Sequence, residues 1–352
     1  MKTRWYFLVM CLMAVWVFPD SILLAAEKPV TVAELALYKG ADRQQILEAG
    51  ARKEGKLTFY TSGILKQAVR PVVNAFEKKY PFIKVQIWRA SSSTVIARLT
   101  EEYAGRKKIG DVIEGTQTTF MFLQKHKIAQ SFYSPNIVNM VEEAMTKAPK
   151  KGFYAVAFRG SGISLGYNTK LISEEELPKT YEDLLDPKWK GKMTVAGSYT
   201  GTIWLGTMLH VYGEDFVKKM AQQDFDVHMV SGRAVLDMII AGEYIFSPTI
   251  YDSHAINSKN QGAPVDWVPL EPVPTNIGQI ALLRNSPNPH AAMLFVDFEL
   301  TKKSAEIHKS AGYSTFHKDV PVLKVYKKYF GAEDMQAVKR QQELFSRFFL
   351  KK

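Results

Sequence analysis

The stretch ISLGYNTKLISEEELPKTYEDLLDPKWKGKMTVAG, residues 163–197, holds most of the signals that decide the fold. An apolar run at 163–167 predicts a strand. Thr180 can cap a short helix over 181–185, because its hydroxyl accepts a hydrogen bond from a backbone N–H of the first turn. The Asp-Pro step that follows ends this helix, and a second strand is predicted at 192–195. The chain therefore leaves one α/β unit here, docks a short helix and begins another sheet.

Strands alternate with helices upstream of this stretch. The helix between the first two strands has apolar residues at i, i+3, i+4 and i+7, which form one face of an amphipathic helix. No hairpin signal separates the strands, so we predict a parallel sheet covered by helices. The strands are predicted at 56–60, 83–88 and 111–113, and the apolar face of the helix consists of Val69, Val72, Val73 and Phe76.

The same alternation continues downstream and predicts a second α/β unit, followed by two more strands after a Pro-rich turn. The predicted elements are strands at 192–195, 244–250, 265–270 and 275–283, with helices starting near Tyr199 and Ser231.

Small hydroxyl residues stand where the predicted strands end. In parallel sheets, ligands bind beyond the carboxyl ends of the strands. Hydroxyls and backbone N–H groups at helix starts suit an anion or a polyol, although such residues can also serve only as helix caps. Arg233, which opens a helix, can either contact the charge of a ligand or pair with a nearby acid. The candidate ligand-binding residues are Thr61, Ser62, Ser91, Ser92, Thr116, Ser198, Thr200, Arg233, Tyr251 and Asp252.

The central stretch also resembles a known family. The tripeptide YNT after an aliphatic strand, then LPKTYEDL, DPKWKGK and another strand, follow one another as in the extracellular solute-binding proteins of ABC importers. The most similar branch is family 1, which includes the ferric-ion-binding proteins. The Pro-Asn-Pro step at 287–289 resembles a helix start of the same family, and the resemblance covers about residues 55–316.

The resemblance implies a two-lobed periplasmic binding protein-like fold of type II, in which each lobe is a mainly parallel α/β sheet flanked by helices. We expect a first lobe of residues 27–169 plus 264–352 and a second lobe of residues 170–263. Such a protein is expected to be a periplasmic monomer that closes on a small solute and delivers it to the permease subunits of an ABC importer. It is expected to be neither an enzyme nor dependent on a cofactor. A sensor that hands its solute to a receptor is an alternative.

A ferric ion is the other candidate solute, because ferric-binding members hold iron with a His after the first strand, a Glu after the third and a Tyr pair in the second lobe. This sequence has Thr61 and Ser62 after the first strand, Thr116 near the place of the Glu, and Tyr251 followed by Asp252 in place of the Tyr pair. Fe(III) requires several anionic oxygen donors. No metal site is therefore predicted, and a small organic or phosphorylated anion is favoured. The arginines that could hold it are Arg89, Arg159 and Arg233.

Length, charge and motifs indicate a two-domain protein and give no sign of nucleic-acid binding or of a nucleotide or zinc motif. At 352 residues the chain is long enough for two domains. Its formal charge is +11, but the Lys and Arg residues are scattered without a long basic block, so nucleic-acid binding is not indicated. The sequence contains no P-loop and no two His residues at HxxxH spacing.

The N-terminus is typical of a signal peptide at residues 1–26. Two basic residues precede an apolar core at 5–18, and small residues at 25–26 offer a cleavage site before Glu27. Cys11 is the only cysteine of the chain, so the mature protein is expected to contain no disulfide and no thiol nucleophile.

We predict that export removes the residues before about Glu27. Mass spectrometry of the exported protein is expected to show a chain that begins near this position. A full-length chain that stays in the cytoplasm would contradict the prediction.

Overall fold

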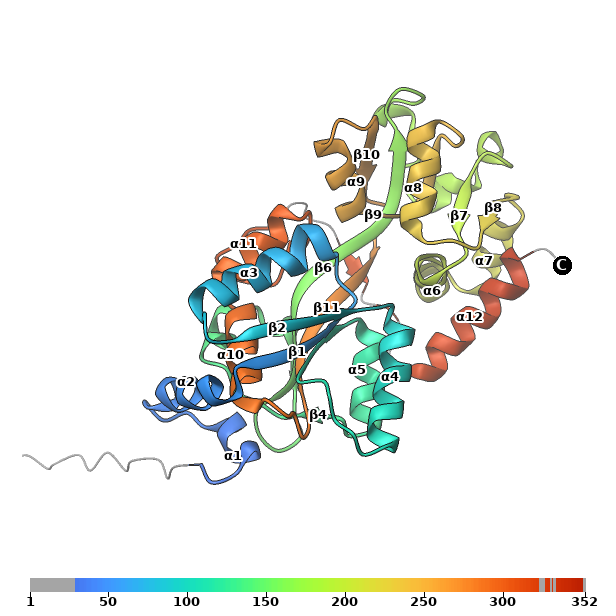
Figure 1. Ribbon diagram of the computed structural model, residues 1–352. Coiled ribbons are helices and arrows are strands. Elements are labelled where there is room, and N and C mark those ends of the chain that lie inside the picture. The colour runs from blue at the N-terminus through green and yellow to red at the C-terminus, as the bar shows by residue number, and fades with distance from the viewer. Residues whose placement is uncertain (1–28, 323–326, 330, 332–333, 351–352) are drawn as a thin grey trace, which may run out of the picture.

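The computed structural model describes residues 29–322, 327–329, 331 and 334–350, and the predicted signal peptide lies outside them. Figure 1 shows two lobes, each a sheet with helices around it, joined where strand β6 runs from one to the other. This is the two-lobed α/β architecture that the sequence predicts. No helix in the described part of the chain is both long and apolar enough to cross a membrane.

Three parallel strands form the basis of the first lobe. β1 (Lys56–Thr61) lies between β2 (Lys84–Arg89) and β3 (Val112–Gly115), as the alternation of strands and helices predicts. β11 (Val273–Leu283) pairs antiparallel with β3, and β6 (Phe153–Asn168) pairs antiparallel with β11. Short strands on β6 and β11 extend this sheet: β4 (Ala129–Gln130), β5 (Met145–Lys147) and β12 (Ser314–Thr315).

Helices cover the first sheet and supply its core. The predicted apolar face is buried at Val72, Val73 and Phe76. The ring of Phe295 lies 4.8 Å from that of Phe59 in β1 and 5.0 Å from that of Phe76, so helices from distant parts of the sequence meet on one side of the sheet. The helices are α1 (Val32–Leu37), α2 (Arg43–Glu54), α3 (Arg70–Lys79), α4 (Ser92–Ala104), α5 (Gln117–Lys125), α10 (Pro289–Glu299) and α11 (Lys302–Ser310), with single turns at Leu65–Val69, Pro135–Asn139 and Glu142–Ala144.

The second lobe contains a parallel pair of strands and two strands that pair with β6. The parallel pair is β7 (Thr194–Ala196) with β8 (Asp226–His228), and β9 (Phe246–Tyr251) and β10 (Val265–Val268) pair antiparallel with β6. The helices are α6 (Tyr199–Tyr212), α7 (Glu214–Ala221), α8 (Gly232–Ala241) and α9 (Asp252–Asn260), with short turns at Glu174–Glu176, Glu182–Leu185 and Pro187–Trp189.

The central stretch docks into the second lobe as predicted. Thr180 Oγ1 accepts a hydrogen bond from the Asp183 N–H at 3.2 Å, and the turn Glu182–Leu185 that follows is a 3-10 helix. Leu184 and Trp189 are buried, and the Trp189 ring lies 5.0 Å from that of Phe246 in β9. The apolar side chains of this stretch therefore anchor the segment that leads from β6 into β7.

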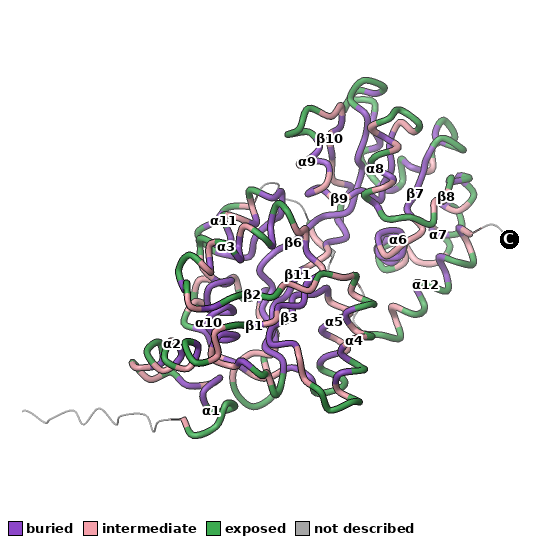
Figure 2. The backbone as a smooth tube through the Cα atoms, viewed as in Figure 1, coloured by how far each residue is buried: buried purple, intermediate pink, exposed green. Residues whose placement is uncertain are grey.

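Strand β6 belongs to both lobes. All but its first two residues are buried (Figure 2). Its first half pairs with β11, and its second half pairs with β9 from Ile163 and with β10 from Leu165, one on each edge. Ser164 lies within a G-x-S-x-G sequence, but in the middle of this strand. Its hydroxyl accepts a hydrogen bond from the Leu270 N–H at 2.6 Å, so it does not form the strand-to-helix elbow of a hydrolase.

The C-terminal part of the chain corrects the expected lobe boundaries. β13 (Lys328–Tyr329) pairs with the start of β11, and α12 (Met335–Phe349) packs on α6 and α7 of the second lobe (Figure 1). We had expected all of 264–352 in the first lobe. The apolar face of α12 instead packs around Trp204 of the second lobe, whose ring lies 5.7 Å from that of Phe349. Gly201 permits the approach, because a Cβ there would lie 2.9 Å from the Phe345 ring.

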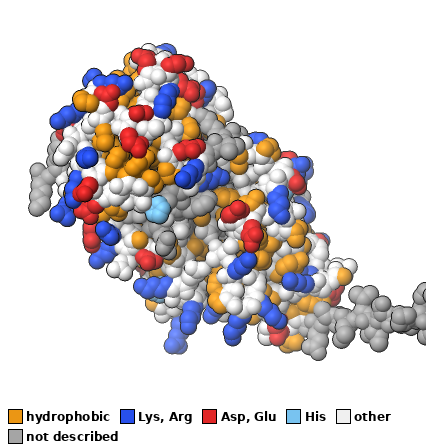
Figure 3. Space-filling view, turned by 180° about the vertical axis from the view of Figure 1, so that it is seen from behind, with side chains coloured by type: hydrophobic (Ala, Val, Ile, Leu, Met, Phe, Trp, Pro, Cys, Tyr) orange, Lys and Arg blue, Asp and Glu red, His pale blue; other side chains and the backbone are white. Residues whose placement is uncertain are grey.

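Charged side chains are dispersed over the surface. On the face shown in Figure 3, Lys and Arg are mixed with Asp and Glu, and the positive side chains do not merge into one continuous patch. On this face, therefore, the positive side chains are dispersed and form no concentrated basic surface.

We predict that Phe345→Ala lowers the free energy of unfolding of the second lobe by about 3–5 kcal/mol, because it leaves a cavity between α12 and α6. Denaturant unfolding followed by tryptophan fluorescence measures this change. Ser346→Ala, on the exposed side of the same helix, is the control and should change stability by less than about 0.5 kcal/mol. Equal effects of the two variants would show that α12 does not stabilise the lobe.

Candidate functional site

The strand ends of the first lobe bring the predicted hydroxyl residues together. Thr116 Oγ1 lies 3.1 Å from Ser92 Oγ, which links the start of α5 to the start of α4. Ser91 caps α4 by accepting a hydrogen bond from the Thr94 N–H at 3.3 Å. Thr116 precedes α5 and makes no capping hydrogen bond with its side chain. The N–H groups of the first turn of α5 therefore face the cleft side of the sheet without a side-chain cap.

Glu114 occupies the centre of this edge, and the sequence analysis missed it. One carboxylate oxygen, Oε2, accepts hydrogen bonds from Thr61 Oγ1 at 2.5 Å, from the Ser62 N–H at 2.8 Å and from the Gly63 N–H at 3.0 Å. The turn after β1 thus directs its donors at an internal carboxylate. The two predicted residues Thr61 and Ser62 organise the site through Glu114.

Arg159 of β6 forms a buried ion pair with the other Glu114 oxygen. Both side chains are at most 4 % exposed. The guanidinium also lies over the Tyr313 ring, 4.7 Å from its centroid. Burial by itself raises the pKa of the Glu114 carboxyl. Arg159 and the hydrogen bonds from Thr61 and Ser62 lower the pKa by more than burial raises it, so it lies below the ordinary value.

Arg89 is the cation of this edge that has no carboxylate partner among the described residues. It ends β2, it is exposed, and its Nε donates a long hydrogen bond of 3.4 Å to the Gly63 carbonyl. The sequence predicts it as one of three arginines that could hold an anion. The structure gives it the geometry expected of a residue that meets a ligand, because its charge is beside the Ser62 turn and is not neutralised by an acid.

Arg233 pairs with a nearby acid, which is the second of the two roles that the sequence allows for it. Its guanidinium contacts Asp237 Oδ1 at 2.6 Å and donates to Ser258 Oγ at 2.7 Å. The Asp237 carboxylate is one helical turn away on α8, a spacing that favours such pairs. We therefore do not include Arg233 among the residues proposed to hold the solute.

Two hinge residues hold the second-lobe residues Tyr251 and Asp252 in place. Ser161 of β6 donates to Asp252 Oδ1 at 2.6 Å, and Asn276 of β11 donates to the Tyr251 hydroxyl at 3.2 Å. Ser161 and Asn276 are cross-strand partners, so their side chains project from the same face of the hinge. The start of α9 is therefore fixed to the strands that join the lobes.

Ser198 and Thr200 lie at the start of α6. Ser198 Oγ is 3.3 Å from Thr200 Oγ1, and Ser198 makes no capping hydrogen bond to the backbone. Tyr199 lies between them and lines a small cavity of about 20 Å³ together with Gln117 and Thr118 of α5. The helix starts of the two lobes thus approach each other across the cleft.

Tyr251 and Tyr313 lie near Arg159, and Tyr199 lies near Tyr251. Burial raises the pKa of Tyr199 to about 12, and burial likewise raises the pKa values of Tyr251 and Tyr313 although Arg159 opposes the shift in both. All three phenols carry their protons at neutral pH, so they can donate hydrogen bonds to an anion.

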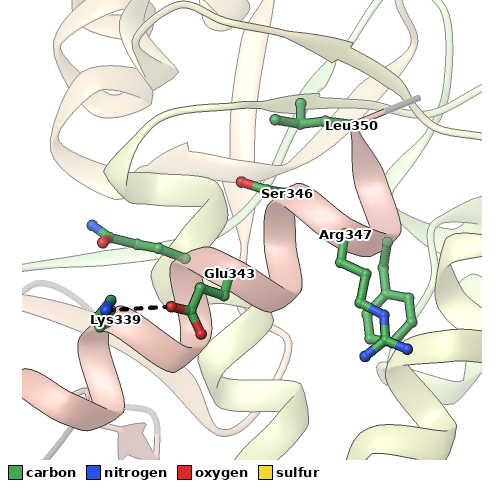
Figure 4. A pocket seen from close by; sticks show the side chains of 7 residues that line it. Lys339, Glu343, Ser346, Arg347 and Leu350 are labelled. Atoms are coloured by element: carbon green, nitrogen blue, oxygen red, sulfur yellow. Dashed lines mark ion pairs between the residues drawn. The ribbon is translucent and has the colours of Figure 1, made fainter. Parts of the chain in front are cut away.

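A surface hollow of about 780 Å³ lies elsewhere, on the outer side of α12. It is lined by residues of this helix and by Leu350, and Figure 4 shows the Lys339–Glu343 ion pair at one end and Arg347 at the other. A hollow on one face of one helix cannot enclose a solute, so the cleft is the better candidate site. Among the described residues, no group of three or more His, Cys, Asp or Glu side chains is placed to hold a metal ion.

Comparison with known proteins identifies relatives of this chain. Residues 108–330 match the family described as bacterial extracellular solute-binding protein. A protein of Haemophilus influenzae without a functional name is 26% identical over 280 residues, which are 76% of this chain and 79% of that protein.

Two solved structures share the fold at low sequence identity. Iron-bound HitA from Pseudomonas aeruginosa superposes with a TM-score of 0.69 at 17% identity, covering 84% of this chain and 99% of HitA. AfuA from Actinobacillus pleuropneumoniae, with exogenous fructose-6-phosphate bound, superposes with a TM-score of 0.68 at 22% identity and the same coverage.

We predict that Glu114→Gln lowers the free energy of unfolding by about 3–5 kcal/mol at neutral pH, because it leaves the Arg159 charge buried without its counter-ion. The folded-state pKa of Glu114 is lowered, so the stabilisation is present above the unfolded pKa of about 4.3 and is lost as pH falls below it. The difference between wild type and variant should therefore shrink between about pH 5 and pH 3.

Denaturant unfolding at several pH values measures this difference. Glu142→Gln is the control, since Glu142 pairs with Lys147 at an exposed site and should change stability by less than about 1 kcal/mol. A Glu114→Gln protein as stable as wild type at pH 7 would contradict a role for the pair.

Proposed function

Because the chain belongs to the bacterial extracellular solute-binding proteins, a family of binding proteins rather than enzymes, we propose that it is the periplasmic solute-binding component of an ABC importer. It captures a small anionic solute between its two lobes as a monomer and delivers it to the membrane permease. The lobes proposed to close are residues 29–169 with 264–322, and residues 170–263 with α12.

The observation that carries the anion proposal is that Arg89 has no acidic partner among the described residues. Its guanidinium stands at the cleft edge of the first lobe. A charge-assisted hydrogen bond to a bound anion contributes about 1.5–3 kcal/mol. The uncapped starts of α5 and α6 add N–H groups and the positive ends of helix dipoles.

The hydroxyl groups around the cleft support the same proposal. Ser92 and Thr116 from the first lobe and Ser198 and Tyr251 from the second offer O–H donors to a ligand that accepts hydrogen bonds. The AfuA structure, which has the same fold, contains fructose-6-phosphate, a solute of this chemical kind.

A ferric ion is the less favoured solute. HitA, which also shares the fold, binds iron. In this chain, however, both oxygens of Glu114 already accept hydrogen bonds, and the Arg159 guanidinium beside them repels a cation. The phenols are protonated at neutral pH, so a metal would have to displace their protons before binding.

We predict that Arg89→Ala weakens binding of the solute by about tenfold to a hundredfold, since about 1.4 kcal/mol corresponds to tenfold. A thermal-shift screen of the mature protein with carboxylates, phosphonates, sugar phosphates and ferric salts identifies a ligand, and calorimetry on the variant then measures its affinity.

Arg233→Ala is the matched control, because it removes a guanidinium that Asp237 neutralises. Its affinity should stay within about threefold of wild type. An unchanged affinity in a folded Arg89→Ala protein, or tight binding only of ferric ion or of an uncharged solute, would contradict the anion proposal.

A further inference from the structure

Asn276 has a polar atom that no other described residue satisfies. Its Nδ2 donates to the Tyr251 hydroxyl at 3.2 Å, while its Oδ1 is buried and without a hydrogen-bond partner. Turning the amide over would satisfy Oδ1 but would leave the NH₂ group in its place. In either orientation, one buried polar atom of this side chain therefore lacks a partner among the described residues. This costs free energy unless a ligand or water supplies the missing hydrogen bond.

Asn276 lies in the hinge, where β11 pairs with the strand that enters both lobes. The residue lies opposite Ser161 in the hinge, and the Ser161 hydroxyl reaches the Asp252 carboxylate at the start of α9. Asn276 is partly exposed although its Oδ1 is buried. Its neighbour Thr275 is buried and its hydroxyl donates to the Val273 carbonyl. Since successive side chains alternate along a strand, Asn276 is on the face of β11 that meets Tyr251 and Thr275 is on the opposite face.

Tyr251 completes a pair of complementary groups. Its oxygen accepts the hydrogen bond from Asn276, so its O–H proton is available to a further acceptor. Asn276 Oδ1 accepts and the Tyr251 O–H donates, and a ligand hydroxyl can satisfy both because it is itself a donor and an acceptor. A carboxylate or phosphate oxygen offers no proton to Oδ1, and a metal ion offers none either.

We infer that Asn276 is a specificity-determining residue that, with Tyr251, binds a hydroxyl group of the solute. The solute class is a small anion that carries at least one hydroxyl, with its charge at the Arg89 edge and its hydroxyl at the hinge. This inference rests on the proposed function, because it concerns the same cleft.

Matched pairs of anions that differ only by hydroxyl groups test the inference. The probes are glycerol 3-phosphate with propyl phosphate, and malate with succinate. Calorimetry on the mature wild-type protein should show that the hydroxylated member of at least one pair binds about tenfold to a hundredfold more tightly, because its analogue leaves Oδ1 unsatisfied. In Asn276→Leu this preference should fall to less than about threefold, chiefly through weaker binding of the hydroxylated member.

The controls separate recognition from mere positioning of Tyr251. If Asn276 only positioned Tyr251, Asn276→Leu would weaken both members of a pair equally, and that result would overturn the inference. Thr275→Val, the adjacent hinge residue on the opposite face, should keep the wild-type preference. Equal binding of both members by wild type would overturn the inference while leaving the anion proposal standing. Binding of neither member of either pair would overturn the inference, and Arg89→Ala with the ligand found by screening would then decide the anion proposal separately.

Discussion

The buried ion pair between Glu114 and Arg159 is the interaction on which the floor of the cleft depends. It joins β3, in the parallel part of the first sheet, to β6, the strand that enters both lobes. The same carboxylate also holds the turn after β1 through the N–H groups of Ser62 and Gly63. A charge buried to this degree is tolerated only with its partner in place. The strand ends and the crossing strand therefore keep one relative arrangement, from which the other cleft residues take their positions.

This pairing decides what the cleft can offer a solute. The Glu114 carboxylate is neutralised by Arg159, and the phenols of Tyr199, Tyr251 and Tyr313 keep their protons at neutral pH. For the solute that we propose, the cleft then offers O–H and N–H donors together with Arg89, which has no acidic partner among the described residues. The charges that the site can offer a solute therefore depend on which charged residues lack an internal partner, and not only on which charged residues are present.

Periodicity and strand-end position could be read from the sequence because both are local. They located the parallel strands, the buried face of α3 and the residues Thr61, Ser62 and Thr116 at the sheet edge. Glu114 escaped this reasoning because it lies inside β3, two residues before the loop where an acid was sought. Asn276 likewise lies inside a strand. The pairing of Arg233 with Asp237 is local, an i,i+4 pair on α8. The docking of α12, in contrast, depends on contacts between distant segments, which no window of the sequence encodes.

The path of the C-terminal segment has a consequence for how the molecule can be observed. The described chain begins in α1 of the first lobe and ends with α12 on the second, beyond the point where β13 pairs with the hinge (Figure 1). Its two ends are therefore attached to different rigid bodies. A donor and an acceptor fluorophore fused at these ends would convert any rotation of one lobe against the other into a change in energy transfer, which makes the native connectivity a ready scaffold for an optical sensor of its own solute.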